Sequence, residues 1–244
     1  MAIGYRDARA PEGVRLYAIG DVHGRLDLLE RMHAVIAAEL ERDNPADWRI
    51  IHLGDYVDRG PDSRGVIDFL IARVQADPRN IALAGNHDAG FLDFLADPDG
   101  SGLFARYGGR ETGLSYGVEI QFDRPDALRR GWAELSRMVP EKHRAFLRAL
   151  PRSVTFGDFY FCHAGIRPGI PLERQDPEDL IWIRQEFLTC EDRHPKVIVH
   201  GHTPHREPQV MDNRVNIDTL AYLSGVLTAF VVDGQAKCLI QATE

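Results

Sequence analysis

The sequence predicts an α/β fold with two β-sheets, and three features of its order lead to this prediction. In the first ninety residues, an apolar strand, a glycine-containing polar loop and a helical pattern follow one another three times. From Ser153 onward, short apolar runs typical of strands replace the helical spacing. Residues 90–150 match neither pattern. Alternating strands and helices favour a parallel sheet, and the later strands favour a second sheet stacked on the first.

The first part of the chain begins with an expected loose leader, residues 1–13, and then alternates strands with helices. Apolar residues recur at helical spacing between Leu26 and Arg42, and Asn44-Pro45 ends that helix. The predicted strands are Val14–Ile19, Arg49–Leu53 and Asn80–Ala84, and the predicted helices are Leu26–Arg42 and Ser63–Gln75. Because parallel strands end at one edge of their sheet, we expect the loops that follow them to meet there.

Residues 90–150 are interpreted as a helical cap inserted into a single domain that spans residues 1–244. This segment contains DPDGSG and YGGRETG, followed by two predicted helices, Ala127–Met138 and Glu141–Leu150. It matches no motif, so we expect substrate specificity to depend on it. Its arginines either contact acidic substrates or form a solvated helix face, and we favour the solvated face. These arginines are Arg106, Arg110, Arg124, Arg129 and Arg130.

The last part of the chain reads as six strands that form the second sheet. The predicted strands are Ser153–Phe156, Phe159–His163, Lys196–His200, Val215–Ile217, Val226–Val232 and Lys237–Gln241. Several short strands bounded by polar turns are typical of such a sheet.

The composition argues against several classes of function. A net charge of −8 argues against a broad surface for nucleic acid or anionic membrane. No apolar run approaches the roughly 20 residues of a membrane span, and the N-terminal stretch lacks the apolar region of a signal peptide. The three cysteines include no CxxC pair, which fits a reducing compartment. We therefore expect a cytoplasmic protein without nucleic-acid or membrane partners, as a monomer or small homo-oligomer.

Polar side chains, most of them able to bind metal, follow five of the predicted strands. They are Asp21 and His23 in GDVHG, Asp55, Asp58 and Arg59 in GDYVDRG, Asn86 and His87 in GNHD, His163 in FCHAG, and His202 in VHGHTP. Carboxylate, imidazole and amide oxygen without thiolate favour Mn²⁺, Fe or Zn²⁺ over Mg²⁺. Six such ligands exceed the needs of one metal and suit a pair of metals that share a carboxylate.

Each of these elements also has an ordinary structural explanation. A GD pair after a strand is usually a turn, GNHD could be an Asx turn, and a buried histidine is more often a hydrogen-bonded core residue than a ligand. We assign His33 and His52 to such structural roles, and His143 and His194 to the surface. Turn chemistry does not explain why all the motifs follow apolar strands in this order, so we interpret the set as one metal site.

These motifs resemble the metallophosphoesterase signature, and more narrowly that of the phosphoprotein phosphatases, the bacterial and phage serine/threonine phosphatases. VDRG is the most specific part, and LIWIRQEF and NIDT...GVLTAF resemble later family segments. The likeness extends from Asp21 to about Thr228. It implies the calcineurin-like fold, a four-layer αββα sandwich of two mixed sheets flanked by helices.

The resemblance also implies a role for each residue. Asp21 and His23 would bind the first metal, Asp55 would bridge both, and Asn86, His163 and His202 would complete the second. Arg59, Arg184 and Asn86 would bind the substrate phosphate. His87 would be the general acid, oriented by Asp58. The two divalent ions are expected to be Mn²⁺, with Fe, Zn²⁺, Co²⁺ and Ni²⁺ as alternatives.

The activity implied is hydrolysis of phosphoserine, phosphothreonine or a broader set of phosphomonoesters, by attack of a metal-bridging hydroxide on phosphorus. The substrate would be a phosphorylated protein or a small phosphoester. An alternative is a symmetrical dinucleoside tetraphosphatase, because Asp88 in GNHD is typical of those enzymes, whereas protein phosphatases more often have glutamate. Asp58 favours the phosphatase, because the tetraphosphatases usually lack the aspartate of VDRG. Leu220 departs from the pattern, since the family commonly has glycine at this position. A third possibility is a catalytically silent binding protein with the same fold.

Overall fold

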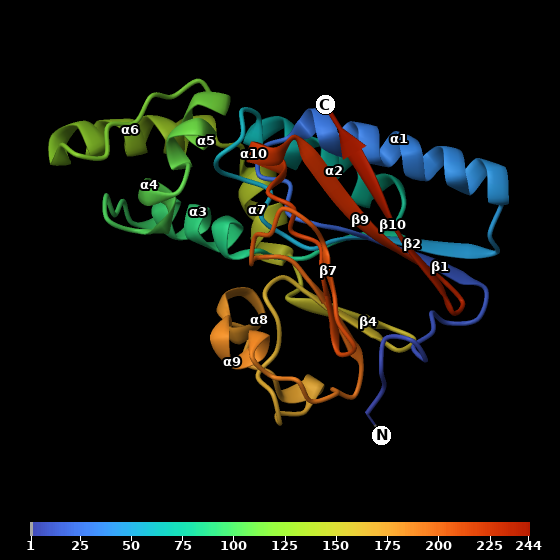
Figure 1. Cartoon of the computed structure of the whole chain (residues 1–244). Coiled ribbons are helices and arrows are strands. Elements are labelled where there is room, and N and C mark those ends of the chain that lie inside the picture. The colour runs from blue at the N-terminus through green and yellow to red at the C-terminus, as the bar shows by residue number, and fades with distance from the viewer. Residues whose placement is uncertain (1) are drawn as a thin grey trace.

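The computed structural model describes residues 2–244 and contains two five-stranded sheets (Figure 1). The first sheet is mixed and has the strand order β10-β9-β1-β2-β3. Its strands are β1 (Val14–Ile19), β2 (Asp47–His52), β3 (Asn80–Ala82), β9 (Val226–Asp233) and β10 (Ala236–Thr243). β1, β2 and β3 are parallel, whereas β9 runs antiparallel to β1 and pairs with β10 as a hairpin. The parallel strands therefore end at the same edge.

The second sheet is also mixed and has the order β4-β5-β6-β8-β7. Its strands are β4 (Ser153–Phe156), β5 (Phe159–Cys162), β6 (Val197–His200), β7 (Gln209–Val210) and β8 (Arg214–Asn216). β5, β6 and β8 are parallel, and β4 and β7 form antiparallel edges. The two sheets pack face to face, as predicted.

The period-two alternation of the strands explains how each sheet serves two cores. On β1, Leu16 and Ala18 enter the core between the sheets, while Tyr17 and Ile19 face the helices on the other side. On β6, Val197 and Val199 lie between the sheets, while the intervening residue packs against the opposite outer layer. The inner strands β5, β6 and β9 are buried on both faces, which explains their nearly continuous apolar sequences.

Helices cover the outer faces and complete the four layers. α1 (Leu26–Asp43) and α2 (Ser63–Ala76) pack on the first sheet. The second sheet is covered by short elements, η1 (Leu172–Arg174), α8 (Asp179–Trp182) and α9 (Gln185–Leu188), and α10 (Ala221–Ser224) precedes β9. No helix in residues 2–244 is long and apolar enough to cross a membrane.

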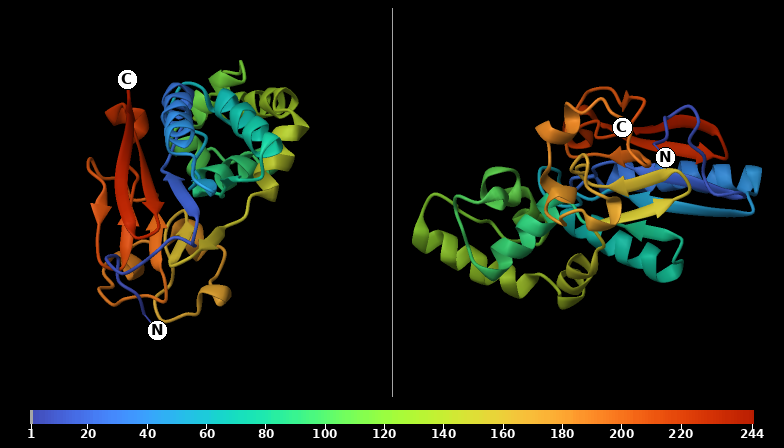
Figure 2. Two further views of the ribbon diagram at one scale, coloured as in Figure 1. Left: turned by 90° about the vertical axis from the view of Figure 1, so that its right-hand side faces the viewer. Right: turned by 90° about the horizontal axis from the view of Figure 1, so that it is seen from below.

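Between β3 and β4 the chain forms five helices that project from one end of the sheets (Figures 1 and 2). They are α3 (Asn86–Ala96), α4 (Leu103–Arg106), α5 (Gly109–Ser115), α6 (Pro125–Met138) and α7 (Glu141–Ala149). α6 and α7 agree with the sequence prediction, whereas α4 and α5 were not predicted. Phe91 and Phe94 each stack on Phe104, and the three rings belong to the same hydrophobic core as the helices that pack on the first sheet.

Two sequence-based expectations about this fold were wrong. β9 and β10 belong to the first sheet, because β9 pairs with β1 along five residues. The stretch expected to be a loose leader is packed over residues 2–13, where Tyr5 N–H donates to the Asp212 carbonyl and Ala8 is fully buried. Met1 of that stretch lies outside the described residues. Local sequence does not reveal either result, since both depend on partners far along the chain.

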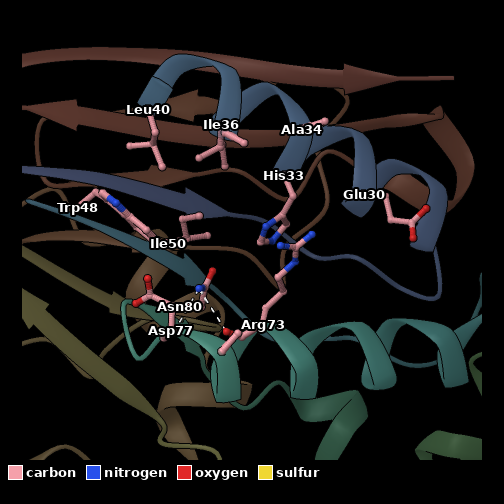
Figure 3. A pocket seen from close by; sticks show the side chains of 12 residues that line it. Glu30, His33, Ala34, Ile36, Leu40, Trp48, Ile50, Arg73, Asp77 and Asn80 are labelled. Atoms are coloured by element: carbon pink, nitrogen blue, oxygen red, sulfur yellow. Dashed lines mark hydrogen bonds between the residues drawn. The ribbon is translucent and has the colours of Figure 1, made fainter. Parts of the chain in front are cut away.

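A pocket of about 380 Å³ lies between α1, α2 and β2, away from the ends of the parallel strands (Figure 3). His33 lines it and stacks on His52, and their Nε2 atoms are 2.9 Å apart. His52 Nδ1 donates to the Ile81 carbonyl, so its Nε2 accepts a hydrogen bond from His33 Nε2. The predicted structural roles of both histidines agree with this arrangement.

Candidate active site

The carboxyl ends of five strands from both sheets bring the predicted ligands together. Asp21 follows β1, Asp55 follows β2 and Asn86 follows β3 in the first sheet. His163 follows β5 and His202 follows β6 in the second sheet. All five side chains are almost completely buried. The site therefore lies where the edges of the two stacked sheets meet.

Asp55 lies at the centre of this cluster. It belongs to two groups of side chains whose possible ligand atoms lie within 4.8 Å of one another, one with His23 and His87 and the other with Asp21 and His163. Its Oδ2 is 3.4 Å from His23 Nε2, and its Oδ1 is 3.4 Å from His163 Nε2. One carboxylate thus faces two separate sets of ligands, which is the position a bridging ligand needs.

The histidines predicted to bind the second metal converge on the amide oxygen of Asn86. His163 Nε2 is 2.9 Å and His202 Nδ1 is 2.8 Å from Asn86 Oδ1. His163 is held by a hydrogen bond from Nδ1 to the Leu53 carbonyl, and His23 by one from Nδ1 to the Val57 carbonyl. These backbone partners fix the tautomers and leave Nε2 of both rings as the ligand atom.

The backbone is strained at this cluster. Of the seven described non-glycine residues with positive φ, five are His23, Asp55, Asp58, Arg59 and His202. Such conformations cost energy and concentrate at functional sites. A Cβ on the residue before Asn86, Gly85, would lie 2.2 Å from Asp55 N, so only glycine allows this approach. The strain independently marks the same residues as a functional site.

Asp88 fastens the loop that carries Asp55. Its carboxylate accepts hydrogen bonds from the backbone N–H groups of Asp55, Tyr56 and Gly85, at 2.9, 2.9 and 3.0 Å. The bond from Gly85 N–H also caps the start of α3. The aspartate of GNHD is therefore part of the support for the ligand loop, a role that the sequence alone did not assign.

His87 and Asp58 form a buried pair in which His87 Nδ1 lies 2.7 Å from Asp58 Oδ2. The other ring nitrogen of His87, Nε2, is 3.1 Å from Arg59 Nη2 and faces the cluster. The other oxygen of Asp58 accepts a hydrogen bond from Thr112 on α5. Sequence reasoning missed Thr112, since no motif surrounds it.

The two predicted phosphate-binding arginines approach the cluster from different sides. Arg59 Nη1 donates to His23 Nε2 at 3.0 Å, and its guanidinium stacks over the Tyr222 ring at 4.8 Å. Arg184 is exposed, and its Nη2 donates to the His202 carbonyl at 3.2 Å. Tyr222, on α10, was also missed, although it lies in the NIDT...GVLTAF stretch. Together the arginines place positive charge beside the ligand cluster.

Burial shifts the pKa values of the ligands in a consistent direction. It raises the pKa of Asp21, to which nearby Asp218 and Asp55 also contribute, and it raises the pKa of Asp55. It lowers the pKa of His163 to about 3 and lowers that of His202. The raised aspartate pKa values and the lowered histidine pKa values both mean that, when no cation is bound, the charged forms of these side chains are disfavoured. A divalent cation reverses the effect for the carboxylates and needs neutral imidazoles as ligands.

The residues present fit divalent metal ions. The donor atoms are carboxylate and amide oxygens and imidazole nitrogens, a set suited to Mn²⁺, Fe or Zn²⁺. His202 Nδ1 points to the cluster, whereas its buried Nε2 has no hydrogen-bond partner among the described residues.

The prediction that His143 and His194 lie at the surface was wrong, because both are buried. His143 forms hydrogen bonds with the Tyr116 hydroxyl and the Asp68 carboxylate, and the His194 ring stacks on Phe187.

Two stacked mixed sheets, with metal-capable side chains at five strand ends, define the metallophosphoesterase fold. The sequence profile of the calcineurin-like phosphoesterases matches residues 14–230. The chain therefore belongs to this family, and its general activity is phosphoester hydrolysis. The narrower likeness to serine/threonine phosphatases is not established by this match.

Curated relatives include proteins named bis(5′-nucleosyl)-tetraphosphatase PrpE [asymmetrical]. The one from Anoxybacillus flavithermus (strain DSM 21510 / WK1) is 27% identical over 237 residues, covering 86% of this chain and 87% of the relative. The one from Bacillus thuringiensis (strain Al Hakam) is 26% identical over 231 residues, with the same coverage of both chains.

Solved structures with the same fold carry different activities in their descriptions. A protein provisionally described as a diadenosine tetraphosphatase has a TM-score of 0.67 at 20% identity, covering 96% of this chain and 98% of that one. A protein serine/threonine phosphatase from Saccharomyces cerevisiae has a TM-score of 0.58 at 14% identity, covering 98% of this chain and 85% of that one. At these identities, the likeness establishes the fold alone.

Proposed function

We propose that this protein hydrolyses phosphate esters with two divalent cations, of which Mn²⁺ is our first choice. The first would be held by Asp21, His23 and Asp55, and the second by Asp55, Asn86, His163 and His202. The observation that carries the proposal is the position of Asp55, whose Oδ2 lies 3.4 Å from His23 Nε2 and whose Oδ1 lies 3.4 Å from His163 Nε2. When bound, such cations lower the pKa of a water molecule and neutralise phosphate charge.

The chain's own residues would supply the remaining chemistry. Arg59 and Arg184 are proposed to bind the phosphate oxygens, since each guanidinium offers a fork of donors to an anion. Asn86 is proposed to contact the same phosphate. The Arg59–Tyr222 stacking favours one orientation of the guanidinium, which reduces the entropy lost on binding.

His87 is proposed to protonate the leaving oxygen from Nε2, with Asp58 accepting the hydrogen bond from Nδ1. Burial lowers the pKa of His87, while the charge of Asp55 opposes that shift. A bound phosphate ester brings negative charge to the ring and favours the imidazolium form. The donor matters most for an alkoxide, which is a poor leaving group without a proton. This argues for phosphoserine, phosphothreonine or other alkyl phosphomonoesters as substrates.

The names of the curated relatives favour a second candidate, hydrolysis of dinucleoside tetraphosphates. Its leaving group is a nucleotide phosphate, which departs without a proton, so this reaction depends less on His87. The relatives are named as asymmetrical enzymes, whereas Asp88 led us to expect a symmetrical alternative.

The two candidates are separated by comparing kcat/KM for a phosphoserine peptide and for diadenosine tetraphosphate with Mn²⁺-loaded protein. We expect the peptide to be preferred. Preference for the dinucleotide would reject this choice, and the products would then show its type. Two ADP molecules indicate symmetrical cleavage, whereas AMP and ATP indicate asymmetrical cleavage. The absence of metal-dependent turnover on either substrate, in folded and loaded protein, would instead favour a silent binding protein.

The role of His87 gives the first mutational prediction. His87→Asn should lower kcat on the phosphopeptide by about 10²–10⁴-fold, as expected for loss of a general acid. Metal content, measured by elemental analysis, should stay at the wild-type value because His87 is not assigned as a ligand. A loss of metal would show that His87 binds the first cation, as its proximity to His23 and Asp55 would allow.

A further inference from the structure

The segment between β3 and β4 reaches into the candidate active site through one hydroxyl group. Thr112 lies on α5, 54 residues along the chain from Asp58, and it is completely buried. Its Oγ1 donates to Asp58 Oδ1 at 2.7 Å. The same oxygen accepts the Asp58 backbone N–H at 2.8 Å. One side chain of the inserted segment therefore holds Asp58 at two points.

The hydrogen bonds of this hydroxyl are fully used. A threonine hydroxyl has one donor and two acceptor positions. Asp58 takes the donor and one acceptor position, and Ser63 Oγ, 3.0 Å away, takes the other. Since no capacity is left for rotation to another partner, the group orients Asp58 in a single way.

This orientation bears directly on His87. The two oxygens of Asp58 are divided, with Oδ1 facing Thr112 and Oδ2 facing His87 Nδ1. Fixing Oδ1 fixes the carboxylate plane and therefore the direction in which Oδ2 meets the ring. Asp58 itself has φ of 71°, a strained conformation that its neighbours must hold in place.

A second contact between the same segments reinforces the arrangement. Arg59 N–H donates to the carbonyl of Gly108, which precedes α5, at 3.3 Å. A Cβ on Gly108 would lie 2.2 Å from Arg59 N, so the two backbones approach more closely than a side chain permits. The turn before α5 and the VDRG loop thus pack against each other next to the Thr112–Asp58 contact.

We infer that Thr112 is a positioning residue for leaving-group protonation, through which the inserted segment controls the alignment of His87. This inference rests on the proposed function, because it requires His87 to be the proton donor. It predicts a dependence on the leaving group that a purely structural role would not produce. Loss of alignment should slow the release of alkoxides and spare leaving groups that need no proton.

The test compares Thr112→Val with wild type on a phosphoserine peptide and on p-nitrophenyl phosphate, with Mn²⁺-loaded protein. Thr112→Val keeps the shape and removes the hydroxyl. It should lower kcat on the peptide by about tenfold, less than complete loss of a general acid, with KM and p-nitrophenyl phosphate turnover nearly unchanged. Thr112→Ser restores the donor and should recover the peptide rate.

Ser115→Ala is the matched control, because it removes a hydroxyl from the same helix that contacts the Thr112 carbonyl and the Arg64 N–H but neither Asp58 nor the Thr112 hydroxyl. It should keep the wild-type ratio between the two substrates. In the His87→Asn background, Thr112→Val should cause no additional loss, since both act on one step. If Thr112→Val does not fold, Thr112→Cys gives the same comparison, because a thiol is a weak donor.

The results distinguish the inference from the proposed function. Equal losses on both substrates for Thr112→Val, or no loss on either, would overturn the role of Thr112. If His87→Asn shows the leaving-group dependence and Thr112→Val does not, the inference alone fails. If His87→Asn itself shows no such dependence, the assigned proton donor is wrong and both fail together.

Discussion

At the scale of single residues, Asp88 stabilises the loop on which the candidate metal site depends. Its buried carboxylate accepts three backbone hydrogen bonds, and burial together with the charge of Asp55 raises its pKa to about 7. An amide at this position keeps one acceptor oxygen but turns an NH₂ group toward backbone donors. One or more of these buried N–H groups would then lose its partner.

Asp88→Asn should therefore reduce both stability and metal affinity. We expect the free energy of unfolding in urea to fall by about 2–4 kcal/mol, as for lost hydrogen bonds to a charged group. Mn²⁺ affinity, measured by isothermal titration calorimetry, should fall about 10- to 100-fold, as for the loss of a support for metal ligands. Asp93→Asn, on the exposed side of the same helix, serves as control and should change neither quantity. Unchanged affinity in Asp88→Asn would contradict the support role.

The residues of the site differ in how far the sequence could predict them. Asp21, Asp55 and Asn86 could be placed together because each follows an apolar strand, and parallel strands end at one edge. Thr112 could not be placed, because its contact with Asp58 depends on how a motif-free segment folds back onto the sheets. The sequence thus identifies the side chains that follow strands at the edge of a sheet, and misses those that come from a segment without a motif.

At the scale of elements, a hydrogen bond between His33 and His52 joins α1 to β2, and His33 lines the pocket between α1 and α2. Burial and the neighbouring His52 lower the pKa of His33 to about 2, and burial lowers that of His52 to about 4. Both rings are therefore neutral in the folded state. Between pH 6.5 and these values, the unfolded chain takes up protons that the folded chain does not, so acidification favours unfolding.

Replacing one ring of this pair should make stability less dependent on pH. His33→Gln keeps a donor for His52 Nε2 and removes one titrating group. We expect the urea midpoint of wild type to fall more steeply than that of His33→Gln between pH 7.5 and 5. At pH 7.5, the variant should be less stable by about 1 kcal/mol through poorer hydrogen-bond geometry. The same decrease for both proteins would show that His33 does not contribute to the acid sensitivity.

Elements were predicted well where periodicity is local and poorly where a partner decides. α6 and α7 were placed within two residues of their observed ends, because apolar spacing alone defines them. β9 was assigned to the wrong sheet, since pairing with β1 brings together residues more than 200 positions apart. His143 was assigned to the surface, yet it is buried, and Tyr116 after α5 and Asp68 on α2 form hydrogen bonds with it. Periodicity reports which face is apolar, but it does not report which element covers that face.

At the scale of the whole molecule, the ligand cluster joins the two sheets. Asp21, Asp55 and Asn86 come from strand ends of the first sheet, and His163 and His202 from those of the second. Without a cation, the buried carboxylates Asp21 and Asp55 have raised pKa values, so their negative charges oppose folding near neutral pH. Cations bound between the sheets would remove this cost and bind only the folded chain.

Metal removal should therefore lower the thermal stability of the entire chain. At Mn²⁺ concentrations about 100-fold above Kd, binding adds about 2.7 kcal/mol, which corresponds to about 5–10 °C in Tm for a chain of this size. Scanning calorimetry with Mn²⁺ and with EDTA measures the difference. Asp55→Asn should lose most of this difference in Tm between Mn²⁺ and EDTA. In EDTA, the Tm of the variant should be no lower than that of wild type, because the variant lacks one buried carboxylate. Asp93→Asn should retain the full difference. If EDTA leaves the wild-type Tm unchanged, or if Asp55→Asn responds to Mn²⁺ as wild type does, the cluster does not hold metal between the sheets as inferred.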